Sequence, residues 1–318
     1  MKIVSLDGQA LNPGDLSWKC FEEFGEITVY PRTATKEEVI HRLQGVDIVL
    51  LNKVPLTDEI MAACPDLKLI CVLATGYNVV DCAAAARRGI PVCNVPAYST
   101  NAVAQFTFSL LLELCNRVGH HDWAVHQGRW SSCPNFCFWD TPQMELAGKT
   151  MGIIGFGRIG QAVGRIAKAF GMEVLAYNRS RCAEGETIGT YTDLDVLLAR
   201  SDIVSLHLPL TAENTGMVND EFLSKMKDGA ILLNTARGGL IDEAALKRAL
   251  VFGKLRGAAA DVAAEEPIPA DSPLLTAPNM VITPHLAWAP LETRQRILDI
   301  TVDSIRAWQA GTPKNQVN

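Results

Sequence analysis

The sequence has no hydrophobic run long enough to cross a membrane. Its longest apolar stretch, residues 103–114, is interrupted by Gln105, Ser109 and Glu113 and is shorter than the roughly 20 residues that a spanning helix needs. Residues 1–7 read as a strand and not as a signal peptide. Basic residues form no run, and the formal net charge is -6, so the cationic surface of a nucleic-acid-binding protein is also missing. These absences predict neither a membrane partner nor a nucleic-acid partner.

Cysteines are thinly spread along the chain. Their count, nine over 318 residues, is odd, which fits reduced thiols in a cytoplasmic protein better than a disulfide framework. The most suspicious spacing, Cys133-x-x-x-Cys137, is followed by no histidine or cysteine pair at zinc-finger spacing. The sequence therefore predicts a cytoplasmic location and no metal site.

Short apolar strands alternate with helical patterns along almost the whole chain. Such alternation predicts α/β architecture, with doubly wound parallel sheets and helices on both faces. The length of 318 residues and the number of strands both indicate two domains. We expect strands at residues 2–6, 27–30, 47–51, 69–74, 91–94, 150–154, 173–178, 203–206, 230–234, 257–261 and 281–283.

Two long helices are expected. The first covers residues 101–118, is capped by Ser99 or Thr100 and is ended by Gly119. The second covers residues 291–310 and closes the chain. The break between the two domains is expected just before the first of these helices, near residues 96–100.

A glycine-rich motif is the strongest local signal. Gly155-Phe156-Gly157-Arg158-Ile159-Gly160 has the spacing G-x-G-x-x-G and lies between an expected strand and an expected helix. In that context the first glycine allows the tight turn, the second lets the backbone approach a pyrophosphate, and the third permits close helix–strand packing. Unpaired N–H groups at the helix start attract phosphate charge. The alternative is a turn without a ligand, but the strand–turn–helix context favours a dinucleotide site.

The end of the next strand predicts which dinucleotide binds. Asn178 stands where an acidic residue would bind both ribose hydroxyls and repel a 2′-phosphate. Arg179, Ser180 and Arg181 follow directly and are suited to hold that phosphate. The sequence therefore favours NADP(H) over NAD(H), with an ordinary solvated basic loop as the alternative.

Three later segments carry candidate chemistry at strand ends. Arg237 follows strand 230–234, Glu265 and Glu266 follow strand 257–261, and His285 follows strand 281–283. Ligands of doubly wound sheets bind outside the carboxyl ends of the strands, so these side chains are expected to converge there. Taken singly, each has a plain alternative: a surface ion pair, a solvated charge pair or a strand cap.

With these motifs the sequence resembles the D-2-hydroxyacid dehydrogenase family over essentially its whole length. Within the family it is most similar to the glycerate dehydrogenases, also called hydroxypyruvate or glyoxylate reductases. The family motifs appear here as the glycine-rich turn, Asn234-Thr235-Ala236-Arg237-Gly238, Asp261-Val262, Glu265-Glu266-Pro267 and Pro284-His285. The closer match is carried by Asp7-Gly8, residues 11–18, Ala74-Thr75-Gly76-Tyr77-Asn78 and residues 285–289.

The resemblance implies catalytic roles for three residues. Arg237 would orient the substrate, because a planar guanidinium can grip a carboxylate or bracket the carboxylate and the ketone oxygen. His285 would be the general acid that protonates the carbonyl oxygen as the hydride arrives. Glu266, just before Pro267, matches the partner that favours the protonated imidazole. From the sequence, Glu265 remains an alternative partner.

The resemblance also implies binding residues. Asp261 has two interpretations, as a residue near the nicotinamide or as a cap on a strand-end turn; for His207 the backbone, not the imidazole, borders the cofactor. A wall of the substrate pocket is expected from Trp288, and the N–H of Gly76 is expected to bind the substrate carboxylate. The full cofactor set is Val103, Gly155, Gly157, Arg158, Ile159, Gly160, Asn178, Arg179, Ser180, His207, Leu208, Pro209, Thr235, Ala236, Arg237, Asp261 and His285, beside Thr100. The full substrate set is Asn52, Lys53, Thr75, Gly76, Tyr77 and Trp288.

The resemblance implies an oxidoreductase that reduces hydroxypyruvate or glyoxylate to D-glycerate or glycolate with NAD(P)H. Residues 1–98 plus 289–318 would form a flavodoxin-like substrate domain and residues 99–288 a Rossmann domain, with a hinge cleft that excludes water. The family also builds a homodimer from the region that includes Trp139, although plain packing is an alternative for that side chain. Rival readings are a related dehydrogenase for another 2-keto acid and an NAD(P)-sensing corepressor.

Overall fold

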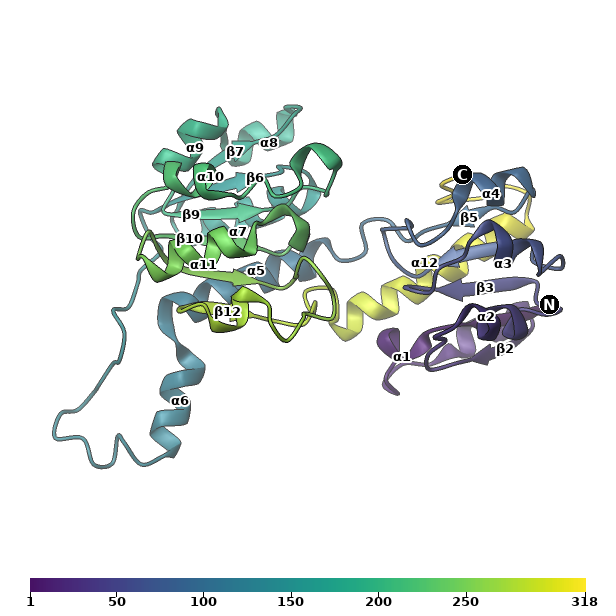
Figure 1. Ribbon diagram of the computed structural model, residues 1–318, viewed down its shortest axis with the longest axis horizontal. Coiled ribbons are helices and arrows are strands. Elements are labelled where there is room, and N and C mark those ends of the chain that lie inside the picture. The colour runs from purple at the N-terminus through teal and green to yellow at the C-terminus, as the bar shows by residue number, and fades with distance from the viewer. The chain divides into compact units, whose positions relative to one another are not determined.

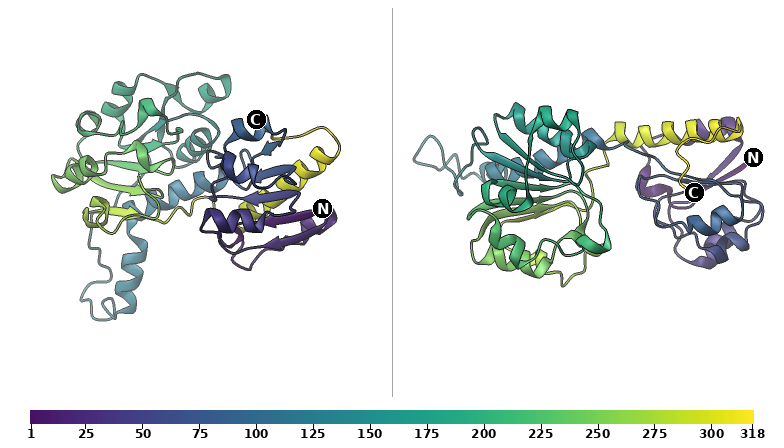
Figure 2. Two further views of the ribbon diagram at one scale, coloured as in Figure 1. Left: turned by 45° about the vertical axis from the view of Figure 1, so that its right-hand side comes forward. Right: turned by 90° about the horizontal axis from the view of Figure 1, so that it is seen from above.

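The protein consists of two compact units, each built on one parallel sheet. The computed structural model describes all 318 residues. Unit 1 comprises Met1–Ser99 and Trp288–Asn318, and unit 2 comprises Thr100–Ala287. In each unit helices cover both faces of the sheet (Figures 1 and 2). The predicted fold class, two doubly wound parallel-sheet domains, is confirmed.

Unit 1 has a five-stranded sheet in the order β2-β1-β3-β4-β5, which is the flavodoxin-like order. Its strands are β1 (Lys2–Ser5), β2 (Glu26–Val29), β3 (Ile48–Leu51), β4 (Leu69–Val72) and β5 (Val92–Cys93). Its helices are α1 (Gly8–Leu11), η1 (Trp18–Phe24), α2 (Lys36–Arg42), α3 (Asp58–Ala62), α4 (Cys82–Arg87) and α12 (Leu291–Gln309). Helices α2, α3 and α4 pack on one face, and η1 and α12 on the other.

Unit 2 has a seven-stranded sheet in the order β12-β11-β10-β9-β6-β7-β8, which contains the Rossmann order. Its strands are β6 (Thr150–Ile154), β7 (Glu173–Tyr177), β8 (Thr190–Tyr191), β9 (Ile203–Leu206), β10 (Ala230–Asn234), β11 (Leu255–Ala260) and β12 (Met280–Ile282). Its helices are α5 (Thr100–Asn116), α6 (Val118–His126), α7 (Arg158–Ala169), α8 (Ala183–Ile188), α9 (Leu194–Arg200), η2 (Ala212–Asn214), α10 (Asp220–Lys225), η3 (Gly238–Leu240), α11 (Glu243–Val251) and η4 (Pro273–Thr276).

The central strands are apolar without alternation because both sheet faces are covered. All four residues of β3 and all five of β10 are buried. Strand side chains point alternately to the two faces, so one strand serves two cores. In β10, Leu232 packs with α9, α10 and α11, whereas Ile231 and Leu233 pack with α5 and α7. The apolar runs in the sequence thus specify a doubly covered parallel sheet.

The predicted elements agree with the structure except at two places. Every predicted strand is present, with ends shifted by at most two residues. Strand β8 was not predicted, because its two residues at the sheet edge are too short to give a pattern. Gly119 was wrongly predicted to end the long helix: α5 ends at Asn116, Arg117 turns the backbone into the left-handed region (φ 49°), and Gly119 lies inside α6.

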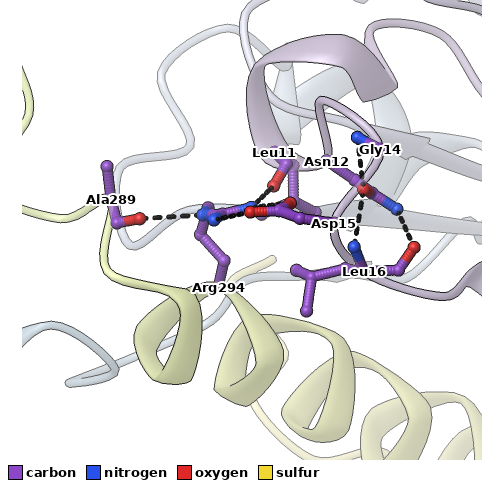
Figure 3. Close-up of polar contacts among 7 residues, drawn as sticks. All are labelled: Leu11, Asn12, Gly14, Asp15, Leu16, Ala289 and Arg294. Carbon is purple, nitrogen blue, oxygen red and sulfur yellow. Dashed lines mark hydrogen bonds and ion pairs between the residues drawn. The ribbon is translucent and has the colours of Figure 1, made fainter.

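In unit 1 a buried arginine joins the N-terminal loop to α12 (Figure 3). Both oxygens of Asp15 accept hydrogen bonds from the Arg294 guanidinium, at 2.7 and 2.6 Å, and the carbonyls of Leu11 and Ala289 accept two more. The ion pair lowers the pKa of Asp15. Asn12 closes the loop by accepting N–H bonds from Gly14 and Leu16 at 3.0 Å. The bidentate pair fixes where α12 starts.

Helix α6 and the residues after it stand away from the sheet of unit 2 (Figures 1 and 2). Large apolar side chains are exposed on this arm, defined here as residues 118–140, at Val118, Trp123, Trp130, Phe136 and Trp139. Asp140, at the end of the arm, bonds back to His120 of α6 at 2.6 Å and to Arg129. These bonds lower the pKa of Asp140 to about 2. None of the helices combines the length and apolar composition that crossing a bilayer requires.

Candidate active site

The glycine-rich turn has the backbone geometry of a phosphate-binding loop. Gly155 (φ 92°) allows the turn, and a Cβ there would lie 2.5 Å from the His207 carbonyl carbon. A Cβ on Gly160 would lie 2.3 Å from the carbonyl oxygen of Gly155. A Cβ on Gly157 would meet nothing within 4 Å, and no side chain caps α7 there. The structure therefore fits a dinucleotide pyrophosphate over Gly157, at the start of α7.

The residues beside this turn take defined positions. Asn178, at the end of β7, accepts a hydrogen bond from the Phe156 N–H at 3.2 Å and donates to the Ser180 carbonyl at 2.8 Å. Asn178 therefore holds the glycine turn and the basic loop together. Arg158 is exposed in the first turn of α7, and Arg179, Ser180 and Arg181 are exposed in the loop. The guanidinium of Arg181 lies 5.7 Å from the centre of the Tyr191 ring.

The carboxyl ends of β10, β11 and β12 lie side by side. Their register pairs Asn234 with Ala260, and Ala260 with Ile282. A Cβ on Gly238 would lie 1.9 Å from the carbonyl of Ala263, so the loop after β10 packs directly on the loop after β11. The segments that carry Arg237, Glu266 and His285 are thus neighbours at one edge of the sheet.

A carboxylate–imidazole pair forms at this edge. Oε2 of Glu266 lies 2.8 Å from Nδ1 of His285, and its other oxygen accepts a hydrogen bond from the Ala263 N–H at 3.3 Å. The side chains of His285 and Glu266 remain 34% and 36% exposed, so ligands can reach the pair. No hydrogen bond or ion pair joins Glu265 to His285. In the structure Glu266, and not Glu265, therefore pairs with His285, and a catalytic role of this pair stays a prediction.

Asp261 builds the turn that presents His285. Its carboxylate accepts hydrogen bonds from the Thr283 hydroxyl at 2.6 Å, the Leu286 N–H at 2.7 Å and the Ala287 N–H at 2.8 Å. It is 1% exposed. These bonds hold the chain on both sides of His285, whose φ of 56° is unusual for a residue other than glycine. The contacts of Asp261 in the structure are those of the turn cap; contact with the nicotinamide stays a prediction.

Arg237 is exposed on a rigid loop and joins no ion pair. Buried Asn234 accepts the Ala236 N–H at 3.0 Å and donates to the Arg237 carbonyl at 2.9 Å. The guanidinium donates one hydrogen bond, at 2.6 Å, to the Ala236 carbonyl. Its remaining N–H groups are available to a ligand, and carboxylates suit the planar guanidinium best.

Thr235 makes a contact that the sequence did not predict. Its hydroxyl lies 3.0 Å from that of Thr107, a fully buried residue of α5 one helical turn after Val103. Thr235 and Val103 are themselves only 9% and 7% exposed. A threonine inside an apolar helix carries no signal of its own in the sequence, so only the packing of α5 on β10 identifies Thr107.

His207, Leu208 and Pro209 follow β9, and the backbone of His207 and Leu208 lies against Gly155. The imidazole Nε2 of His207 bonds the buried Ser205 hydroxyl at 2.8 Å, and burial lowers the pKa of His207 to about 3. A histidine of that kind stays neutral at physiological pH. This low pKa supports the prediction that the His207 side chain is not catalytic, which stays a prediction.

The lowered pKa of His207 predicts that the protein loses stability in acid. The unfolded chain takes up a proton near pH 6.5, whereas the folded chain does so only near pH 3. The unfolded state thus binds more protons between these values, so the free energy of unfolding is expected to fall as pH falls below about 6.5. Urea unfolding at pH 7 and pH 5 should show a larger loss in the wild type than in His207→Asn. An equal loss in both would contradict the burial argument.

In unit 1 two turns at the carboxyl edge of the sheet carry the predicted substrate residues. Asp7 follows β1 and accepts hydrogen bonds from the N–H groups of Asn52 and Lys53, at 2.9 and 2.6 Å. Burial raises the pKa of Asp7. These contacts hold the turn after β3 at the β1/β3 switch point, where ligands of such sheets bind. The sequence did not assign Asp7 this role.

The second turn of unit 1 follows β4. The Thr75 hydroxyl donates to the Val95 carbonyl at 2.8 Å, and the Thr75 carbonyl accepts from Asn94 at 2.8 Å. Gly76 and Tyr77 are exposed at its tip. Trp288 packs partly against the η1 and α12 core of the same unit. The six predicted substrate residues therefore all belong to unit 1, and the three predicted catalytic residues to unit 2.

The fold and the site together define a class of protein. A Rossmann sheet with an open glycine cradle also carries a histidine–carboxylate pair and an unpaired arginine at its carboxyl edge. Reduction of a carbonyl by a hydride needs a proton donor for its oxygen, and a free guanidinium can bind a carboxylate of the substrate. No three His, Cys, Asp or Glu side chains gather as metal ligands. This is a dinucleotide-dependent oxidoreductase.

Comparison with known proteins narrows the class. The sequence profile of the D-isomer specific 2-hydroxyacid dehydrogenase NAD binding domain matches residues 108–287. A hydroxypyruvate reductase of Blautia hydrogenotrophica is 52% identical over 100% of both chains. A glycerate dehydrogenase of Methylorubrum extorquens is 42% identical over 99% of this chain and 98% of its own. The crystal structure of an acyclic imino acid reductase in complex with NADPH and D-Arg is 32% identical and has a TM-score of 0.85 over 100% of both chains.

The matches to the two relatives and to the solved structure cover 99% or more of the chain. The chain belongs to the D-isomer specific 2-hydroxyacid dehydrogenase family. It is accordingly an oxidoreductase that uses a nicotinamide dinucleotide, as the sequence motifs predicted.

Proposed function

We propose that this protein reduces hydroxypyruvate to D-glycerate, and glyoxylate to glycolate, with a reduced nicotinamide dinucleotide. The observation that carries the proposal is the 2.8 Å pair between Glu266 and His285 at the edge of a dinucleotide-binding sheet. Relatives along the full chain are named hydroxypyruvate reductase and glycerate dehydrogenase, which supports this substrate pair.

Each catalytic side chain has a separate task in this reaction. The reduced nicotinamide, when bound, supplies the hydride for the carbonyl carbon. His285 gives its proton to the carbonyl oxygen, so the product leaves as a hydroxy acid. Glu266 holds Nδ1 of the imidazole and so fixes the orientation of the ring. Arg237 binds the substrate carboxylate and polarises the ketone.

Other residues bind the two ligands. We assign unit 1 as the substrate domain, in which the turns at Asn52–Lys53 and Thr75–Tyr77 hold the carboxylate and Trp288 walls the pocket. Unit 2 is the dinucleotide domain. Its cofactor residues are those that line the glycine turn and the ends of β7, β9, β10, β11 and β12, together with Val103.

NADP(H) is the preferred cofactor in this proposal. Asn178 carries no charge that would repel a 2′-phosphate, and Arg179 and Arg181 are exposed beside it without an ion pair. A phosphate between two guanidinium groups forms charge-assisted hydrogen bonds. The complex of a relative with NADPH is consistent with this choice.

The cofactor preference can be tested by charge removal. In Arg179→Ala/Arg181→Ala, kcat/KM for NADPH is expected to fall about tenfold or more, the effect of losing one or two charge-assisted hydrogen bonds, and that for NADH to change little. Arg200→Ala, an exposed arginine in the same unit paired with Glu173, is the matched control. A wild-type preference for NADH, or equal losses for both cofactors, would refute the assignment.

A homodimer is part of the proposal. The exposed apolar side chains of the arm need cover, and an apolar patch of this kind marks an association surface. A cytoplasmic location is also proposed, on the nine free thiols of the chain. Sedimentation of the wild type against Trp123→Ser/Trp130→Ser tests the dimer; a monomeric wild type would exclude it.

The decisive experiment is a substrate panel. NADPH and NADH oxidation is followed with hydroxypyruvate, glyoxylate, pyruvate and phosphohydroxypyruvate. The highest kcat/KM is expected for hydroxypyruvate or glyoxylate. A different best substrate would make the protein another dehydrogenase of the family, and dinucleotide binding without turnover of any keto acid would support a sensor.

A further inference from the structure

A buried threonine pair links α5 to the end of β10. The hydroxyl of Thr107 donates a hydrogen bond to the Val103 carbonyl at 2.8 Å. The same hydroxyl lies 3.0 Å from the hydroxyl of Thr235. Thr107 is 0% exposed and Thr235 is 9% exposed, so water does not compete for these bonds inside the pair.

The direction of the second bond follows from the number of protons. A threonine hydroxyl has one proton to donate and two lone pairs that accept. A carbonyl oxygen only accepts, so the proton of Thr107 is committed to Val103. The bond between the two hydroxyls must therefore run from Thr235 to Thr107. As a result, Thr235 has no proton left for a ligand and keeps lone pairs only.

The backbone around Thr235 is fixed as well. Asn234, fully buried, accepts the Ala236 N–H at 3.0 Å and donates to the Arg237 carbonyl at 2.9 Å. Thr235 thus sits in a closed turn with its side chain bound to α5. Neither its position nor the direction of its proton is free to adjust to a ligand.

We propose that Thr107 is a positioning residue that makes the Thr235 hydroxyl an obligate hydrogen-bond acceptor for the nicotinamide nucleoside. This rests on the proposed cofactor site. The ligand group that contacts the Thr235 hydroxyl must be a hydrogen-bond donor. The nicotinamide nucleoside has two kinds of donor, the ribose hydroxyls and the carboxamide N–H. Without Thr107, the Thr235 proton loses its acceptor and turns toward the ligand, where it meets another donor.

A double-mutant cycle on cofactor affinity tests the proposal. The Kd of NADPH is measured without turnover, by nicotinamide fluorescence, for wild type, Thr107→Val, Thr235→Val and the double variant. Each single variant is expected to weaken binding about tenfold, the effect of one hydrogen bond. The double variant is expected to weaken binding about tenfold as well, not a hundredfold, because Thr107 acts only through Thr235.

Two further variants separate positioning from packing. Thr107→Ser keeps the hydroxyl and is expected to bind like the wild type. Thr301→Val in α12 is the matched control, since this buried threonine makes the same bond to the carbonyl four residues earlier, at 2.7 Å, and has no second hydroxyl. Its Kd should not change. If Thr107→Val does not fold, Thr107→Ala takes its place in the cycle.

The outcomes are distinct. Multiplying effects in the double variant, or an unchanged Kd in Thr107→Val, would overturn the role of Thr107. Failure of the wild type to bind either NADPH or NADH would overturn the proposed function together with it. Replacing the carboxamide by acetyl in the cofactor identifies the donor: the two single variants lose their effect if the donor is the amide, and keep it if the donor is ribose.

Discussion

Replacement of His285 by asparagine is expected to lower kcat by about a thousandfold, the usual contribution of a positioned general acid. Asparagine is the best probe at this position because it tolerates the left-handed backbone that His285 adopts at φ 56°. Its amide N–H₂ also keeps a donor toward Glu266. The variant thus removes the proton that His285 would donate, while the turn held by Asp261 stays in place.

Glu266 and Glu265 form a natural control pair for this experiment. Only Glu266 bonds His285, so Glu266→Gln should reduce activity and Glu265→Gln should not. Full activity in His285→Asn, or equal effects of the two glutamate variants, would contradict the mechanism.

Loss of the Arg237 guanidinium is expected to have the second large effect. In Arg237→Ala, kcat/KM for the keto acid should fall by more than a hundredfold, about 3 kcal/mol, since two charge-assisted hydrogen bonds to one carboxylate are lost. No ion pair in the protein compensates this guanidinium, so its charge is directed to the ligand. Its loop is held by Asn234 from within, and the fold should therefore survive the change.

A lysine at position 237 tests whether the planar shape of the guanidinium matters in addition to its charge. Arg237→Lys keeps the charge but not the planar fork, so its activity should lie between those of the wild type and Arg237→Ala. Added guanidinium ion should restore part of the rate of Arg237→Ala. Wild-type turnover by Arg237→Ala would remove Arg237 from the site.

The strand pattern shows how far sequence reasoning reached. Buried parallel strands are short apolar runs between helices, so all predicted strands were found, whereas the two-residue β8 left no pattern. The predicted helix end at Gly119 was wrong. Glycine often ends a helix, but here Arg117 adopts the left-handed conformation two residues earlier. The glycine motif was informative because each glycine answers a local steric demand, which the backbone contacts of Gly155 and Gly160 show.

The sequence by itself determined the fold class, the dinucleotide turn and the strand ends that carry Arg237, Glu266 and His285, because these depend on local patterns of burial and backbone conformation. Only the tertiary structure decided that Glu266 and not Glu265 pairs with His285, that Asp261 caps the turn of that histidine, and that Thr107 meets Thr235. These contacts join residues 19, 26 and 128 positions apart. Chain spacing does not encode which of two adjacent side chains points inward, because sheet register and helix packing set that direction.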